Sequence, residues 1–165
     1  MECAANNGHF NCVRWLHENS AGKVTYSAMD NAASFGDLEC VKFLHQNRTK
    51  GSSCEAMDRA ATCGHFDVLV WLNENRTERF TPGVGTLSDV IENTGQQEIF
   101  EWLYNHQELD SEDFQQIIEL SVCIGTNDIF KFLHSQNREY DGKDFIEHAT
   151  KNSDLVMGNS SMKME

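Results

Sequence analysis

The feature of this 165-residue chain that most limits its fold is a sequence unit that recurs about every 30 residues. Such a fixed period predicts a stack of similar units, because each unit needs its neighbours to bury its apolar side. The copies can be aligned on a central glycine, at Gly8, Gly36, Gly64, Gly95 and Gly125, with two equal intervals followed by two slightly longer ones. They read AANNGHFNCVRWLHEN from Ala4, AASFGDLECVKFLHQN from Ala32, AATCGHFDVLVWLNEN from Ala60, and the degenerate IENTGQQEIFEWLYNH from Ile91 and SVCIGTNDIFKFLHSQ from Ser121.

The second half of each unit has the apolar pattern of a helix. An aromatic residue stands seven positions after the glycine and leucine follows it, while two further apolar residues stand at the fourth and fifth positions. At 100° per residue these positions share one broad helix face. We therefore predict that the aromatic–leucine pairs form the packed spine of the fold. The pairs are Trp15–Leu16, Phe43–Leu44, Trp71–Leu72, Trp102–Leu103 and Phe132–Leu133.

The first half of each unit predicts another helix, which ends at the glycine. Paired alanines in the first three units allow this helix to approach its neighbours closely. Its starts are predicted at Ser27 with Asp30 and at Thr86 with Asp89, where side chains can satisfy free backbone N–H groups. An acidic residue also recurs six positions before the glycine or its equivalent, and we interpret this row as helix-start acids, not as catalytic carboxylates. The row comprises Glu2, Asp30, Asp58, Asp89, Glu119 and Glu147.

These motifs resemble the ankyrin repeat. SAMDNAASFGDLECVKFL from Ser27 and EAMDRAATCGHFDVLVWL from Glu55 carry the family's double alanine, its glycine and its apolar helix pattern. The family's Pro-Leu-His element is replaced by Ala-Met-Asp from Ala28 and from Ala56, so its histidine bonding between repeats is not carried over. The resemblance implies an all-α solenoid of stacked helix-turn-helix repeats.

The repeats are shorter than the usual ankyrin period of about 33 residues. The missing residues fall in the connections, which leaves little room for protruding β-hairpins, so we expect little or no strand. Another αα-solenoid remains an alternative, and a tetratricopeptide array is a weaker one because it requires a period of about 34 residues and a different pattern.

The domain organisation follows from the same period. We predict one solenoid over residues 1–157, with about five repeats and a C-terminal half-repeat, FIEHATKNSDLVM, from Phe145. Ser153 takes the glycine position in that half-repeat. Residues 158–165 are polar and without pattern, and we expect a disordered tail.

Composition excludes several classes of function. The chain has 26 Asp and Glu against 13 Lys and Arg, a formal net charge of −13, which argues against nucleic-acid binding. A hydrophobic content of 39% is too high for a disordered acidic tail. No apolar run approaches the roughly 20 residues of a membrane span. The start, MECAANNGHF, is not typical of a signal peptide, so we expect an intracellular protein, cytoplasmic or nuclear.

The residues that most often carry chemistry form no recognisable site. The six cysteines include no CxxC pair, no HExxH motif is present, and the seven histidines are scattered. Cys12 and Cys40 share one repeat position with Val68, which favours buried free thiols. His17, His45 and His134 follow the aromatic–leucine pair, where we interpret them as structural. We expect no metal, no cofactor and no enzymatic activity.

The resemblance to ankyrin repeats implies a function in protein–protein interaction, with a partner protein bound on the concave face of the solenoid. We expect no nucleic acid, membrane or small-molecule ligand, and the acidic charge favours a partner with a basic segment. The alternative is a scaffold segment or fragment of a larger repeat protein whose activity lies elsewhere.

Candidate partner-binding residues are those of the first helix beside the buried alanine pair. Phe35 is the aromatic candidate for a binding hot spot, and its alternative role is packing near the helix end. The full predicted set is Asn31, Ser34, Phe35, Arg59, Thr62, Cys63, Asn93 and Thr94.

Overall fold

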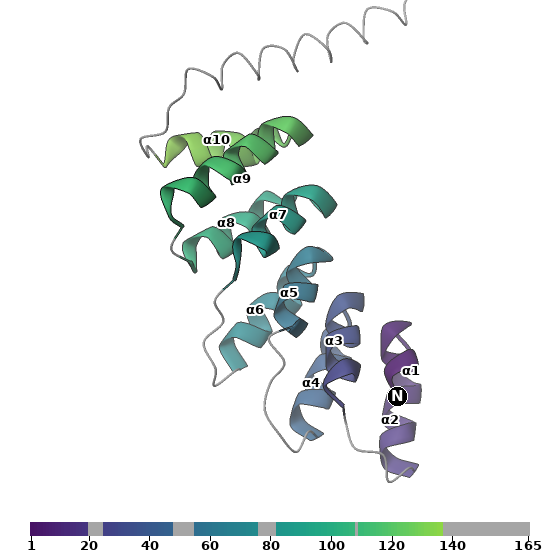
Figure 1. Cartoon of the computed structure of the whole chain (residues 1–165). Coiled ribbons are helices and arrows are strands. Elements are labelled where there is room, and N and C mark those ends of the chain that lie inside the picture. The colour runs from purple at the N-terminus through teal and green to yellow at the C-terminus, as the bar shows by residue number, and fades with distance from the viewer. Residues whose placement is uncertain (20–24, 48–54, 76–81, 108, 137–165) are drawn as a thin grey trace, which may run out of the picture.

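The computed structural model describes residues 1–19, 25–47, 55–75, 82–107 and 109–136, which form ten α-helices and no strand (Figure 1). The helices follow one another in five pairs. The first helices of the pairs are α1 (Glu2–Asn6), α3 (Tyr26–Phe35), α5 (Glu55–Thr62), α7 (Val84–Asn93) and α9 (Ser111–Ile124). The second helices are α2 (Phe10–Asn19), α4 (Leu38–Asn47), α6 (Phe66–Asn75), α8 (Gln97–Asn105) and α10 (Asn127–Ser135). The predicted all-α repeat architecture is confirmed over the described residues.

Each pair turns at its glycine. All five repeat glycines have positive φ, a backbone conformation that other L-residues adopt at a cost. After α3, for example, Gly36 has a φ of 82°, and the N–H groups of Gly36 and Asp37 both donate to the Ala32 carbonyl oxygen, at 3.0 and 3.1 Å. The glycine thus ends the first helix and lets the second begin within a few residues.

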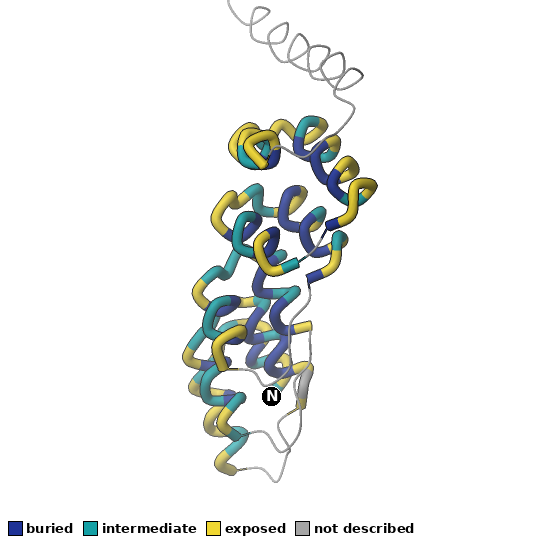
Figure 2. Tube along the Cα trace, turned by 90° about the vertical axis from the view of Figure 1, so that its left-hand side faces the viewer, coloured by how far each residue is buried: buried dark blue, intermediate teal, exposed yellow. Residues whose placement is uncertain are grey.

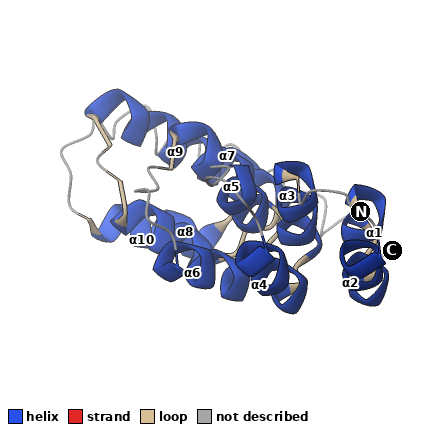
Figure 3. Cartoon of the chain, turned by 90° about the horizontal axis from the view of Figure 1, so that it is seen from below, coloured by secondary structure: helices blue, strands red, loops and turns tan. Residues whose placement is uncertain are grey.

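The pairs stack into two layers, with the first helices on one side and the second helices on the other (Figure 3). Consecutive first helices pack more closely on each other than consecutive second helices do, in every repeat. Buried residues of both layers form one core, and Figure 2 shows buried residues in successive helices along the stack.

The aromatic–leucine pairs divide between the core and its edge. Leu44, Leu72, Leu103 and Leu133 are completely buried, whereas Phe43, Trp71, Trp102 and Phe132 are only partly buried and Trp15 is 61% exposed. The prediction that both members of each pair form the spine was therefore wrong: the four buried leucines form it, Leu16 is only partly buried, and the aromatic rings line its edge.

At three of the five repeats, the residue after the leucine connects neighbouring repeats. The ring of His17 meets Phe43 edge-on at 5.4 Å, and His45 meets Trp71 in the same way at 5.3 Å. Tyr104, at the equivalent position, meets Phe132 at 5.3 Å. These contacts support the structural interpretation of His17 and His45.

The predicted helix starts were wrong. The N-cap of α3 is Thr25, whose side chain accepts a hydrogen bond from the Ala28 N–H at 3.3 Å, so Ser27 lies inside the helix. Gly83 is the N-cap of α7, and Thr86 is likewise inside. In both cases the residue with the extended backbone that an N-cap requires lies earlier in the chain than the predicted one.

Parts of the predicted organisation lie outside the described residues. These are the half-repeat from Phe145, the tail at 158–165 and Glu147, and the single solenoid over 1–157 stays a prediction. Among the helices of the described ranges, none is both long enough and apolar enough to cross a membrane.

Candidate functional site

The first helices each bury one side and expose the other. On α3, Ala28, Met29, Ala32 and Ala33 are buried, and on α5 the equivalent Ala56, Met57, Ala60 and Ala61 are buried. The opposite side of these helices carries Ser27, Asn31 and Ser34 on α3, and Glu55, Arg59 and Thr62 on α5. We call this outward side of α1, α3, α5, α7 and α9 the first-helix face.

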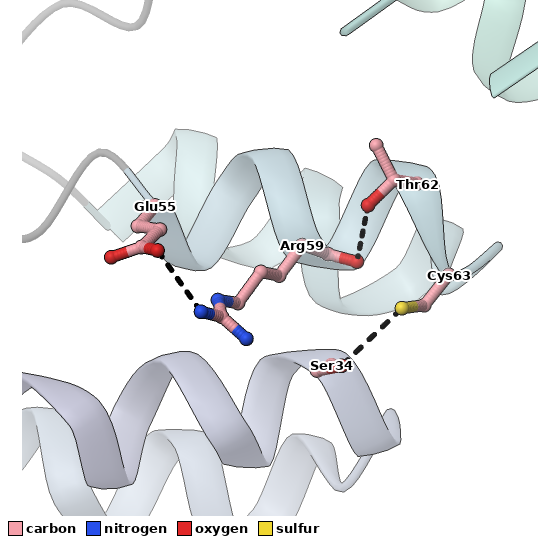
Figure 4. Close-up of polar contacts among 5 residues, drawn as sticks. All are labelled: Ser34, Glu55, Arg59, Thr62 and Cys63. Carbon is pink, nitrogen blue, oxygen red and sulfur yellow. Dashed lines mark hydrogen bonds and ion pairs between the residues drawn. The ribbon is translucent and has the colours of Figure 1, made fainter. Parts of the chain in front are cut away.

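Four predicted site residues come together where α3 meets α5 (Figure 4). Ser34 Oγ lies 3.3 Å from Cys63 Sγ, which links the two helices. Arg59 forms an ion pair with Glu55 at 3.0 Å, and Thr62 Oγ1 donates to the Arg59 carbonyl oxygen at 3.4 Å. These contacts fix the positions of polar groups that remain accessible on the first-helix face.

Two further contacts join α3 to its neighbours. Asn31 Nδ2 donates to the Glu2 carbonyl oxygen at 3.4 Å. On the other side, His65 Nε2 donates to the Ser34 carbonyl oxygen at 3.0 Å, which satisfies an acceptor at the end of α3. A histidine therefore does bond between repeats, although it belongs to the turn and not to the absent Pro-Leu-His element.

Phe35 combines both of the roles considered for it. Its side chain is 51% exposed, yet its ring covers Gly8, where an added Cβ would overlap the ring. The His65 ring covers Gly36 in the same manner. The Phe35 ring is thus fixed against Gly8 on one side and accessible on the other, as expected of an aromatic residue that anchors a bound partner.

The structure does not place Asn93 and Thr94 at positions equivalent to the predicted site residues of α3 and α5. The buried residues of α7 lie nine, eight, five and four positions before Gly95, whereas the buried alanines and methionine of α3 and α5 lie eight, seven, four and three positions before their glycines. The buried side of α7 is therefore displaced by one position. Thr94 caps the helix end, and its hydroxyl donates to the Val90 carbonyl oxygen at 3.0 Å.

The displacement places Asp89 and Glu92 on the first-helix face in repeat 4, where both side chains are exposed. Aligning the unit on its glycine missed them. The signal that could have found them is the longer interval before Gly95, together with the apolar pair Val90–Ile91, which stands one position earlier than the alanine pairs.

Two of the acidic residues that recur six positions before the glycine accept hydrogen bonds from the next repeat. Thr25 Oγ1 donates to Glu2 Oε1 at 2.8 Å, and Thr86 Oγ1 donates to Asp58 Oδ1 at 2.8 Å, in each case from the following repeat. Glu2 and Asp58 also lie in the first turns of α1 and α5, as predicted. Asp30, Asp89 and Glu119 lie deeper within their helices, where the helix-start interpretation was wrong because these helices begin earlier.

The five cysteines of the described ranges are free thiols. Burial, with a smaller contribution from Asp37, raises the pKa of the Cys40 thiol to about 12, so this side chain is an unreactive core residue. Cys12 is exposed, contrary to prediction, because α2 belongs to the first pair and only one side of it is covered. Within the described part of the chain, no three His, Cys, Asp or Glu side chains are grouped to hold a metal ion.

Comparison with known proteins gives one family match, over residues 1–80. The family model "Ankyrin repeats (3 copies)" matches residues 1–80, which include the first three helix pairs. No curated protein and no solved structure matched the chain. Residues 1–80 therefore match the ankyrin-repeat family, with short repeats that lack the Pro-Leu-His element, and the same helix pairs and glycine turns continue through the described residues to 136.

Proposed function

We propose that this protein is a non-enzymatic binding module that holds a partner protein on its first-helix face. Ankyrin repeats are in general protein–protein interaction modules, and the family is typically non-enzymatic. Consecutive first helices pack more closely than consecutive second helices, and this difference favours a concave surface on the first-helix face.

The observation that carries this proposal is the joined set of side chains between α3 and α5. Ser34, Arg59 and Cys63 are held by contacts within and between helices but stay accessible, and Phe35 adds an aromatic ring seated on Gly8. Such a set is preorganised, because its backbone is fixed by the alanine-lined packing beneath, and preorganised groups lose little entropy on binding. The proposed contacts are Asn31, Ser34, Phe35, Arg59, Thr62, Cys63, Asn93 and Thr94, to which we add Asp89 and Glu92.

Site-specific photocrosslinking tests the proposal. A photoreactive phenylalanine analogue is placed at Asn31 or Thr62 on the first-helix face, and at Glu18 or Glu74 on the exposed side of α2 or α6 as controls. We expect a native extract to yield one dominant crosslinked protein from the first pair of positions and none from the controls. Crosslinks of that protein at Glu18 and Glu74, but not at Asn31 and Thr62, would contradict the proposal.

A matched substitution series measures the contribution of the aromatic anchor. Phe35→Ala removes the accessible ring, while Phe43→Ala removes a ring from the second-helix layer. We expect Phe35→Ala to weaken capture of the crosslinked partner by about tenfold or more, as for a hot-spot residue. Circular dichroism shows whether each variant stays folded under the capture conditions.

A further inference from the structure

The net charge of the protein is concentrated in one part of the stack. Residues 1–80 contain ten acidic and eight basic residues, a net charge of −2. Residues 82–136 contain ten acidic residues and a single lysine, Lys131, a net charge of −9. The electrostatic field that would attract a cationic partner is therefore centred on repeats 4 and 5.

Three of these ten acidic residues lie on the first helices, away from their first turns. Asp89 and Glu92 on α7 and Glu119 on α9 are all exposed, and the sequences of α7 and α9 contain no Lys or Arg. In repeat 3, by contrast, Glu55 is paired with Arg59 on the same face. Lys131 lies on α10 and pairs with Asp128 at 3.1 Å.

None of these three carboxylates lies in the first turn of its helix, where the helix dipole favours an anion. Glu92 is the next-to-last residue of α7, where the helix dipole disfavours an anion. Asp89 and Glu119 lie in the middle of their helices, and Glu119 accepts a hydrogen bond from the uncharged Gln115, at 3.0 Å. Glu112 and Asp113, in the first turn of α9, do suit the dipole and form no part of the proposed surface.

An apolar strip on α9 lies on the side that faces α7, the helix that carries Asp89 and Glu92. Leu120 is partly buried and Ile124, one turn further along α9, is 44% exposed. They occupy the repeat positions held by Asn31 and Phe35 in repeat 2, on the side of the helix that faces the preceding repeat. The strip can take an apolar side chain of a bound segment while the carboxylates remain accessible.

We propose that α7 and α9 bind a basic segment of the partner protein, with Lys or Arg side chains at Asp89, Glu92 and Glu119 and an apolar side chain at Leu120 and Ile124. Charge complementarity identifies this occupant, since an acidic helix face repels nucleic acid and attracts a cationic peptide. The inference rests on the proposed function and assigns the basic segment of the partner to the C-terminal repeats.

A defined peptide tests the proposal on the full chain. The probe is the fluorescein-labelled peptide KKLRKLKKLR, and its comparison peptide has serine in place of each leucine. Fluorescence anisotropy measures Kd at about 50 mM and about 300 mM NaCl, because exposed ion pairs are screened by salt. We expect the leucine peptide to bind more tightly than the serine peptide, and salt to weaken both.

Two neutralised variants with the same change in net charge locate the binding face. Asp89→Asn/Glu92→Gln/Glu119→Gln should weaken peptide binding about five- to tenfold, as expected for the loss of three exposed ion pairs. The control, Glu18→Gln/Glu39→Gln/Glu74→Gln, removes one exposed carboxylate from each of α2, α4 and α6 and should change Kd by less than about twofold. Ile124→Ser should weaken the leucine peptide selectively.

Four results would overturn the proposal. They are no binding of the leucine peptide at low salt, equal weakening by the two triple variants, equal affinity for the leucine and serine peptides, and displacement of the peptide by Mg²⁺ beyond the effect of NaCl at equal ionic strength. The last result would indicate a cation site. If any of these occurs while photocrosslinks still map to Asn31 and Thr62, the proposed function stands and only this inference fails.

Discussion

Repeats 1 to 3 and repeats 4 and 5 follow the same sequence pattern but are joined differently. The first three glycines, Gly8, Gly36 and Gly64, are evenly spaced, and α1, α3 and α5 make the closest helix contacts in the stack. The interval from Gly64 to Gly95 is longer, the buried side of α7 is displaced by one position, and α5 contacts α7 less extensively. The family match, which covers residues 1–80, ends at the same junction.

The second-helix layer is also weakened at this junction. Asn73 stands where His17 and His45 supply a ring to the next repeat, and Trp102 stacks instead on His106 of its own repeat, at 3.8 Å. Among consecutive second helices of the described ranges, α6 and α8 contact each other least. In a linear array, stability depends on each repeat and on its interfaces with its nearest neighbours. We therefore expect repeats 1 to 3 and repeats 4 and 5 to unfold separately at the interface between repeats 3 and 4, which we call the 3–4 junction.

The largest expected effect concerns the aromatic edge of the evenly spaced repeats. Trp71 is partly buried, packs against the core and is met by His45, so Trp71→Ala should lower the free energy of unfolding by about 3 kcal/mol. Trp15 is 61% exposed, so Trp15→Ala should lower the free energy of unfolding by less than about 1 kcal/mol. Urea unfolding followed by circular dichroism measures both. Equal losses would mean that exposure does not set the contribution of these rings.

A second comparison uses the glycine turns. Gly36 and Gly125 have nearly equal φ values of 82° and 85°, but the His65 ring covers Gly36 whereas an added Cβ at Gly125 meets nothing within 4 Å. Gly125→Ala should therefore cost about 1 kcal/mol from the backbone alone, and Gly36→Ala about 2 to 3 kcal/mol because the ring must also move. Thermal unfolding of the two variants gives the difference. A larger loss at Gly125 would contradict the proposed role of the ring.

A third prediction concerns the bond that crosses the junction. Thr86 is 9% exposed, and its hydroxyl donates to Asp58 at 2.8 Å, so Thr86→Val removes this donor from a carboxylate oxygen. We expect a loss of about 1 to 2 kcal/mol and a broader unfolding transition, since the two regions would be less coupled. Ser88→Ala, a hydroxyl loss on the same helix, serves as the control. An unchanged transition width in Thr86→Val would show that the bond does not couple the regions.

The smallest effect is expected from the ring that joins repeats 2 and 3. His45→Ala removes the edge-on contact with Trp71 and should cost about 0.5 to 1 kcal/mol. Asn73→Ala changes the equivalent, exposed position at the 3–4 junction and should cost less than about 0.5 kcal/mol. The two variants are compared by chemical unfolding at a fixed pH. Similar losses would mean that the second-helix layer is not weakened at Asn73.

Much of the fold could be predicted from the sequence, because burial within a repeat follows the helix period. Leu44 and Leu72 stand at core positions whatever the neighbouring repeats do, and both are buried. Exposure that depends on a neighbour could not be predicted in this way. Cys12 and Trp15 share the pattern of Cys40 and Trp71, yet they are exposed because no described repeat covers the outer side of α2.

The candidate site was predictable only where the repeats are regular. Ser34 and Cys63 were chosen by their distance from the glycine, and the structure brings them together. The same rule selected Asn93 and Thr94, because it assumes that the buried side of the first helix keeps a constant distance from the glycine, whereas the buried side of α7 is displaced by one position. The buried pair Val90 and Ile91, and not Gly95, fixes the orientation of that helix.

Native-state hydrogen exchange with mass spectrometry tests the central claim, the division of the stack at the 3–4 junction, most directly. Exchange of α3 to α6 and of α7 to α10 is followed at increasing, sub-denaturing urea concentrations. We predict that α7 to α10 open together at a lower urea concentration than α3 to α6. Simultaneous opening of both groups at every urea concentration would contradict the division and show that the solenoid unfolds as one unit.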